Sequence, residues 1–94
     1  MTKAEIVKEI SNQTGVEKAE VLKTVEVFME TVKNSLQAGK NVYLRGFGSF
    51  VVKRRAAKTA RNISKNTSII IPAHNIPFFK PAKTFINKVK LGNK

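Results

Sequence analysis

The chain has 94 residues, of which 41% are hydrophobic, and its formal net charge is +12 at pH 7. This length corresponds to one small domain, and the apolar fraction is too high for a disordered basic tail. The sequence has no cysteine, no aspartate and one histidine, His74. We therefore expect no disulfide, no metal or other cofactor, no small-molecule substrate and no enzymatic activity, because the residues for such sites are scarce.

No apolar run is long enough to span a membrane, and no apolar signal region precedes the first expected helix. These two absences, with the lack of cysteine, fit a protein that stays in the cytoplasm. We expect no membrane partner.

Charge is distributed very unevenly along the chain. Every acidic residue is a glutamate at or before Glu30, and the first 45 residues carry a net charge of only +1. The remaining +11 lies between Gly46 and Lys94, where no acidic residue occurs. Such a cationic half repels itself unless a polyanion neutralises it, and nucleic acid is the most common polyanion to do so.

Two helices are predicted in the first 40 residues. Thr2 and Glu5 have the spacing of a capping box, and Gly15 supplies a left-handed stop for the first helix. A second helix is predicted from about Glu17 to Ala38, before Gly39, because its apolar residues recur at intervals of three and four. These apolar residues are Val21, Leu22, Val25, Phe28, Met29, Val32 and Leu36. The pattern indicates a helical hairpin.

From Asn41 onward the apolar period changes to two, which is typical of strands. Strands are predicted at 42–44 and 49–52, and the second is expected to continue to Arg61. After a turn at 62–66, a strand at 68–71 ends at Pro72, which cannot donate a backbone hydrogen bond. An extended segment at 75–80 and a last helix over 82–89, with Pro81 in its first turn, complete the chain.

The segment from about Lys53 to Ala73 is therefore predicted to be a long β-hairpin arm with almost nothing to bury, and such ribbons are marginal in water. The roughly seventy other residues form a thin core, yet the long helix and the six phenylalanines offer more apolar surface than one body can cover. We therefore expect an obligate dimer. Its core is assigned to Phe28, Leu36, Leu44, Phe47, Phe50 and Phe79.

Small residues lie between the bases of the arm, so a ribbon could lie close against a nucleic-acid groove. Arg and Lys in such a groove recognise backbone charge and groove width more than base identity. The alternative is a solvated basic edge strand that prevents aggregation, but this alternative does not explain why no acid accompanies the bases.

Several motifs, in order along the whole chain, resemble the HU/IHF family of bacterial DNA-bending proteins. They are Gly46-Phe47-Gly48-Ser49-Phe50, the run from Arg55 to Asn62, Ile71-Pro72-Ala73, and Pro77-x-Phe79-Lys80-Pro81-x-Lys83. The resemblance implies an α+β fold and an intertwined dimer with a helical hairpin base, a three-stranded antiparallel sheet, a long β-hairpin arm and a C-terminal helix. It divides the single domain, 1–94, into a helical dimerisation region (1–40), sheet and arm (41–81, the arm about 53–73) and the last helix and tail (82–94).

The resemblance also implies a function, namely to bind duplex DNA with little sequence preference and to bend and compact it in the bacterial nucleoid without a cofactor. Matched positions place the arm bases along the minor groove, and Lys3, Lys80 and Lys83 near flanking phosphates. The alternative for Lys80 and Lys83 is that they are ordinary solvated surface residues. The complete DNA-binding set is Lys3, Lys53, Arg54, Arg55, Lys58, Arg61, Asn62, Ile63, Lys65, Lys80 and Lys83.

The chain departs from the family at the arm tip, where Arg61-Asn62-Ile63 replaces Arg-Asn-Pro. The family's proline wedges between base pairs, and isoleucine is also a residue type that intercalates. We therefore expect Ile63 to act as the wedge, the alternative being a contact with sugar edges. Elsewhere, Glu26 is expected to pair weakly with Lys3 and to compete with phosphates.

Other hypotheses stay open at this point. A sequence-selective bender leaves no simple residue signature. A structural RNA-binding protein is disfavoured because Tyr43 and Phe78 are expected to pack rather than to stack on unpaired bases. A membrane-surface protein is disfavoured because the amphipathic helices are nearly neutral. The partner subunit is either identical or a paralogue.

Overall fold

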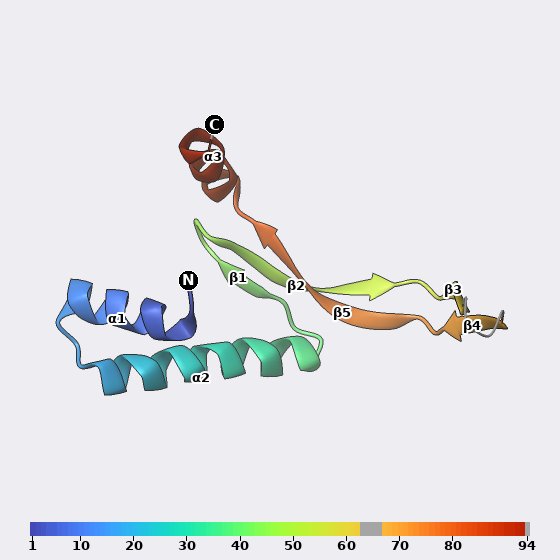
Figure 1. The fold of residues 1–94 in the computed structure, drawn as a ribbon, viewed down its shortest axis with the longest axis horizontal. Coiled ribbons are helices and arrows are strands. Elements are labelled where there is room, and N and C mark those ends of the chain that lie inside the picture. Colours follow the sequence, from blue (N-terminus) through green and yellow to red (C-terminus); the bar gives the residue numbers. More distant parts are fainter. Residues whose placement is uncertain (63–66, 94) are drawn as a thin grey trace. The chain divides into compact units, whose positions relative to one another are not determined.

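The structure is a computed structural model that describes residues 1–62 and 67–93, with only the backbone of 60–62 and 67–69. Its elements follow the order α1, α2, β1, β2, β3, β4, β5, α3 (Figure 1). The chain divides into two compact units, residues 1–35 and 36–94.

Helix α1 covers Lys3–Thr14, as the capping signals predict. The Thr2 hydroxyl accepts from the Glu5 amide at 3.3 Å and also donates to the Glu5 carboxylate at 3.3 Å. Gly15 ends the helix with φ 77°, and its amide donates to the Ser11 carbonyl. A positive φ of this kind is the conformation that favours glycine.

Helix α2 covers Lys18–Gln37, one residue shorter at each end than predicted. The Val21 amide donates to the Glu17 carbonyl, and the Gly39 amide donates to the Leu36 carbonyl. In the first unit, Val7 of α1 and Val21 of α2 are the buried apolar residues among those whose side chains are described. The predicted helical hairpin is therefore correct, although its described core is very small.

A three-stranded antiparallel sheet follows in the order β1-β2-β5, formed by Val42–Leu44, Gly48–Arg55 and His74–Pro81. Strand β1 pairs only with the start of β2, from Val42 opposite Phe50 to Leu44 opposite Gly48. Strand β2 pairs with β5 along its whole length. The α+β fold and the antiparallel sheet expected from the resemblance are confirmed.

Strands β3 (Lys58–Asn62) and β4 (Thr67–Ile71) form a separate two-stranded sheet. The predicted continuous strand to Arg61 is therefore wrong, since it is interrupted at Ala56 and Ala57. The register explains the interruption, because these two residues lie opposite Pro72 and Ala73, between the pairs Arg55–His74 and Lys58–Ile71. Proline has no amide hydrogen to donate to the ladder.

Helix α3 covers Lys83–Gly92, and Ala82 is its N-cap with an extended backbone. Pro81 is the last residue of β5, opposite Gly48, so the expectation that it lies in the first helical turn is wrong. The Ala82 amide donates to the Phe47 carbonyl at 2.9 Å. This bond extends the strand-like segment one residue past the proline, and the helix then continues beyond the predicted end at Val89.

Four phenylalanines form the apolar centre of the second unit, which we call the aromatic cluster. Phe79 lies 4.9 Å from Phe50, 5.2 Å from Phe47 and 6.3 Å from Phe85, measured between ring centroids. Phe47 and Phe85 are stacked at 5.4 Å. The cluster thus joins the turn between β1 and β2, the sheet and α3. Since Phe47 remains 46% exposed, one chain does not cover it.

Candidate nucleic-acid interface

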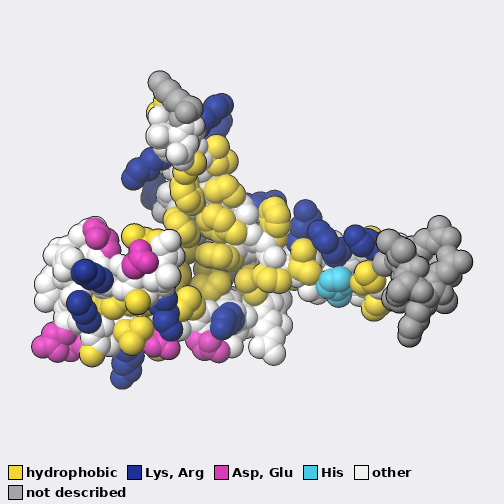
Figure 2. All heavy atoms as spheres, viewed as in Figure 1, with side chains coloured by type: hydrophobic (Ala, Val, Ile, Leu, Met, Phe, Trp, Pro, Cys, Tyr) yellow, Lys and Arg dark blue, Asp and Glu magenta, His cyan; other side chains and the backbone are white. Residues whose placement is uncertain are grey.

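The two units differ in charge as the sequence indicates. All six glutamates lie in the first unit. In the view of Figure 2, acidic side chains gather on α1 and α2, whereas Lys and Arg but no acidic side chain are seen on α3 and on the described part of the arm. Eight described bases of the second half are exposed: Lys53, Arg54, Arg55, Lys58, Lys80, Lys83, Lys88 and Lys90. With no carboxylate side chain after Glu30, their charge is not neutralised within that half.

Three of the predicted arm bases are consecutive on β2, and they lie opposite Ile76, Asn75 and His74 of β5. They are Lys53, Arg54 and Arg55. Because side chains alternate along a strand, Lys53 and Arg55 share one face and Arg54 lies on the other. Lys58 begins β3 beyond the interruption at Ala56 and Ala57, so the alternation of faces along β2 does not continue into β3.

The predicted tip residues are only partly covered by the structure. Arg61 and Asn62 belong to β3, where they lie opposite Ser68 and Thr67. Ile63 and Lys65 lie outside the described residues. The wedge role of Ile63 therefore rests on the sequence alone.

Lys80 on β5 lies directly opposite Ser49 on β2. A hollow beside these strands brings Lys80 together with Lys53 and Arg54, and Asn41, Tyr43, Ser49, Val51 and Val52 complete its lining. A concave surface with three cations and no carboxylate suits a polyanion.

Lys83 is the first residue of α3, and the Ala82 N-cap makes no side-chain hydrogen bond to the helix. The Thr84 hydroxyl donates to the Gly46 carbonyl at 3.4 Å, which fastens the start of α3 to the turn after β1. Lys83 is thereby held on the same unit as Lys80 and the arm.

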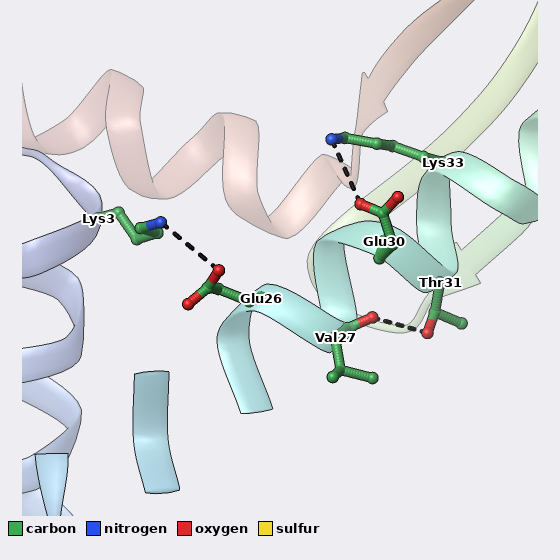
Figure 3. A network of polar contacts seen from close by, with 6 residues as sticks. All are labelled: Lys3, Glu26, Val27, Glu30, Thr31 and Lys33. Atoms are coloured by element: carbon green, nitrogen blue, oxygen red, sulfur yellow. Dashed lines mark hydrogen bonds and ion pairs between the residues drawn. The ribbon is translucent and has the colours of Figure 1, made fainter. Parts of the chain in front are cut away.

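Lys3 is placed differently from the other predicted site residues, because it lies in the first unit and has an acidic partner. Its Nζ is 3.9 Å from Glu26 Oε2, and both side chains are about half exposed (Figure 3). The expected pair is therefore present. A second pair in this unit joins Lys33 Nζ and Glu30 Oε2 at 3.5 Å. Exposed pairs of this kind contribute little free energy, so a phosphate can replace the carboxylate.

Two further residues contribute to this surface, although the sequence predicted only packing for Phe78, which is 39% exposed, and did not single out Asn41. The ring of Phe78 lies under the Lys53 ammonium, with 4.5 Å between Nζ and the ring centroid. Asn41 accepts from the Val52 amide at 3.0 Å and donates to the Tyr43 hydroxyl at 3.2 Å, so it continues the edge of the sheet beyond β1. The period of two is enough to place Phe78 and Phe79 on different faces of the sheet. Only the register of β2 with β5 shows that the Lys53 ammonium lies over the Phe78 ring.

The predicted packing of Tyr43 is wrong in the single chain, where this side chain is 72% exposed. Alternation points it away from Val42 and Leu44, which are half-buried. The residues assigned to a dimer core also keep apolar surface in solvent. Phe28 is 47% exposed and Phe47 46%, while Leu36, Leu44, Phe50 and Phe79 are half-buried.

Neither a candidate membrane span nor a candidate metal cluster occurs among the described residues. Within 1–62 and 67–93, no helix is both long and apolar enough to cross a bilayer. The same residues contain no group of three or more His, Cys, Asp or Glu side chains arranged to hold a metal ion.

Residues 1–90 match a family model described as bacterial DNA-binding protein. The chain is 39% identical over 90 residues to the SPbeta prophage-derived DNA-binding protein HU 2 of Bacillus subtilis, covering 96% of this chain and 98% of that protein. It is 34% identical to the DNA-binding protein HU of Geobacillus stearothermophilus, covering 96% and 100%. The Anabaena HU–DNA cocrystal structure matches with a TM-score of 0.91 and 34% identity, over 95% of this chain and 97% of that one.

Proposed function

The chain belongs to the HU/IHF family of bacterial DNA-binding proteins, and we propose that it binds double-stranded DNA with little sequence preference, bends it and compacts it. Members of this family are architectural DNA-binding proteins and not enzymes. The proposal includes association with the bacterial nucleoid. It requires no cofactor and no small-molecule substrate.

The arm is the observation that carries this proposal. The arm consists of the far ends of β2 and β5 followed by the two-stranded β3–β4 sheet. It bears exposed cations, and no carboxylate side chain occurs near them in the sequence. A two-stranded ribbon is narrow enough to follow a groove of the duplex, and its cations contact phosphates regardless of base identity. The match to an HU structure crystallised with DNA supports this function.

We assign the DNA contacts to two parts of the second unit. The arm contributes Lys53, Arg54, Arg55 and Lys58, with Arg61, Asn62, Ile63 and Lys65 toward its tip. The body contributes Lys80 and Lys83, which contact flanking phosphates. Lys3 of the first unit belongs to the same set, because its exposed pair with Glu26 can exchange one anion for another.

The functional form is a dimer, either of identical chains or with a paralogue. A hollow lined by Phe79, Pro81, Phe85, Ile86, Val89 and Lys90 opens beside the aromatic cluster, and apart from the lysine its lining is apolar. Ile86 and Val89 are 48% and 46% exposed there. A second copy is the expected occupant, because exposed apolar side chains gathered at one hollow are typical of an interface between chains.

A gel-shift titration with linear, nicked and four-way-junction DNA at several salt concentrations tests the proposal, together with the mass of the protein in solution. We expect duplex binding whose log affinity falls with log salt by about 0.9 per phosphate contact. We also expect the mass of a dimer. A slope that corresponds to fewer than about three contacts, or a monomer indifferent to duplexes, would contradict the proposal.

Competition experiments separate this function from the remaining hypotheses. Duplex RNA of matched length should compete less well than duplex DNA, whereas a structural RNA-binding protein would prefer the RNA. Duplexes that differ in deformable pyrimidine–purine steps test sequence selectivity. Equal affinities indicate the unselective binding that we propose.

The substitution Ile63→Ala is expected to retain most of the affinity but to reduce the bend, because the phosphate contacts persist while the apolar wedge is lost. Energy transfer between dyes at the two ends of a duplex measures the bend. Ile70→Ala is the matched control, since Ile70 is another isoleucine of the arm and is 75% exposed on β4. An unchanged bend for Ile63→Ala removes Ile63 from the mechanism.

A further inference from the structure

The contact between Lys53 and Phe78 connects neighbouring strands across one face of the sheet. Val51 lies opposite Phe78 and Lys53 lies opposite Ile76, so Lys53 and Phe78 are diagonal neighbours. The distance of 4.5 Å between the Lys53 Nζ and the ring centroid is within the range of a cation–π interaction.

The aromatic cluster does not explain the phenylalanine at position 78. Phe79 is the β5 residue that contacts the cluster, and alternation places Phe78 on the opposite face, which we call the outer face. The Phe78 ring is 39% exposed there. A large apolar side chain left partly in water suggests a local role, and the contact that the structure shows for its ring is with Lys53.

The ring is a partner that orients a lysine without neutralising it. Lys3, by contrast, pairs with the Glu26 carboxylate, which a phosphate must displace. The π face attracts the Lys53 ammonium but contributes no net charge, and the ammonium has three N–H donors, so those directed away from the ring remain available to an anion. A side chain that is already held also loses less conformational freedom when DNA binds.

We propose that Phe78 is a positioning residue, which holds the Lys53 ammonium on the outer face of the sheet for contact with a DNA phosphate. This inference rests on the proposed function of the chain. Lys80 lies on the same outer face, because it is two residues from Phe78 on β5, and it lines the same hollow as Lys53. Phe78 therefore prepares one half of a two-lysine phosphate contact at the base of the arm.

A double-mutant cycle on the full chain tests this role, with Phe78→Leu, Lys53→Met and the double variant titrated with duplex DNA. Phe78→Leu keeps apolar bulk but removes the ring face, so affinity should fall about two- to fivefold. Lys53→Met should reduce the steepness of the fall in log affinity with log salt concentration by about 0.9. In the Lys53→Met background, Phe78→Leu should have no further effect, and Phe78→Tyr should retain the affinity of the original chain.

The proposal would be overturned if Phe78→Leu lowered the affinity for duplex DNA equally in the original chain and in the Lys53→Met background. The ring would then contact DNA or stabilise the sheet directly. No loss in either background, or no effect of Lys53→Met, would overturn it too. If the original chain still binds duplex DNA in those cases, the proposed function survives. The unbound protein provides a check that requires no variant, since the ring current of Phe78 should shift the Lys53 ε-proton NMR signals upfield, and unshifted signals contradict the contact.

Discussion

Replacing Arg55, Lys58 and Arg61 together by alanine is expected to weaken duplex binding on the order of 100- to 1,000-fold at low salt. Hydrogen bonds to charged groups contribute roughly 1.5–3 kcal/mol each, and three of them on one arm add incompletely. The slope of log affinity against log salt should also decrease by about 0.9 for each lost contact. Fluorescence anisotropy of labelled duplexes of several sequences measures both quantities.

The matched control removes the same number of positive charges from the first unit by replacing Lys8, Lys23 and Lys33 with alanine. If location on the arm determines binding, the affinity of the control for duplex DNA should fall by less than about threefold. This small loss comes from the lower net charge of the whole protein. Equal losses in both variants would show that net charge, not the arm, sets the affinity. A loss by the arm variant that is confined to one duplex sequence would instead indicate direct base readout.

Local signals in the sequence were sufficient to predict the first two helices. The Thr2 cap and the left-handed glycines Gly15 and Gly39 act on backbone groups only a few residues away. Their effect therefore depends little on the rest of the molecule. The bounds of α2 differ from those predicted by one residue at each end, which is within the normal spread of helix ends.

The errors arose where a distant residue decides the local structure. Nothing near Ala56 and Ala57 predicts the break in the outgoing strand, since Pro72 imposes it from across the hairpin. Likewise, proline is well suited to a first helical turn, but Pro81 remains in β5 because the next amide bonds to the Phe47 carbonyl. Long-range partners of this kind cannot be identified before the register is known.

The candidate site shows the same division. The distribution of Lys, Arg and Glu along the chain was enough to locate the cationic half and its arm. The contact between Lys53 and Phe78, by contrast, requires the alignment of β2 with β5, in which a one-residue slip would move Phe78 to the other face. Tyr43 was misjudged because aromatic residues in strands are usually packed, whereas it lies exposed on a short edge strand.

The substitution Gly48→Ala is expected to have the largest effect on stability. Gly48 is buried at the start of β2, and an added Cβ would lie 2.5 Å from the Lys80 carbonyl oxygen and 2.7 Å from two ring atoms of Phe79. The carbonyl belongs to the paired strand β5 and Phe79 is central to the aromatic cluster, so neither can move away easily. We expect a loss of about 3 kcal/mol, which lowers Tm by about 12–24 °C for a domain of this size.

Gly92→Ala is the matched control for this stability prediction, because Gly92 ends α3 and an added Cβ there meets nothing within 4 Å. Alanine also favours the helix more than glycine, so Tm should stay the same or rise slightly. Thermal unfolding of all three proteins must be followed at one protein concentration, since association makes Tm depend on concentration. If Gly48→Ala unfolds at the same temperature as the control, the close approach of β2 to Phe79 is not part of the folded state. The aromatic cluster would then have a different arrangement in solution, and the apolar surface assigned to the dimer interface would change with it.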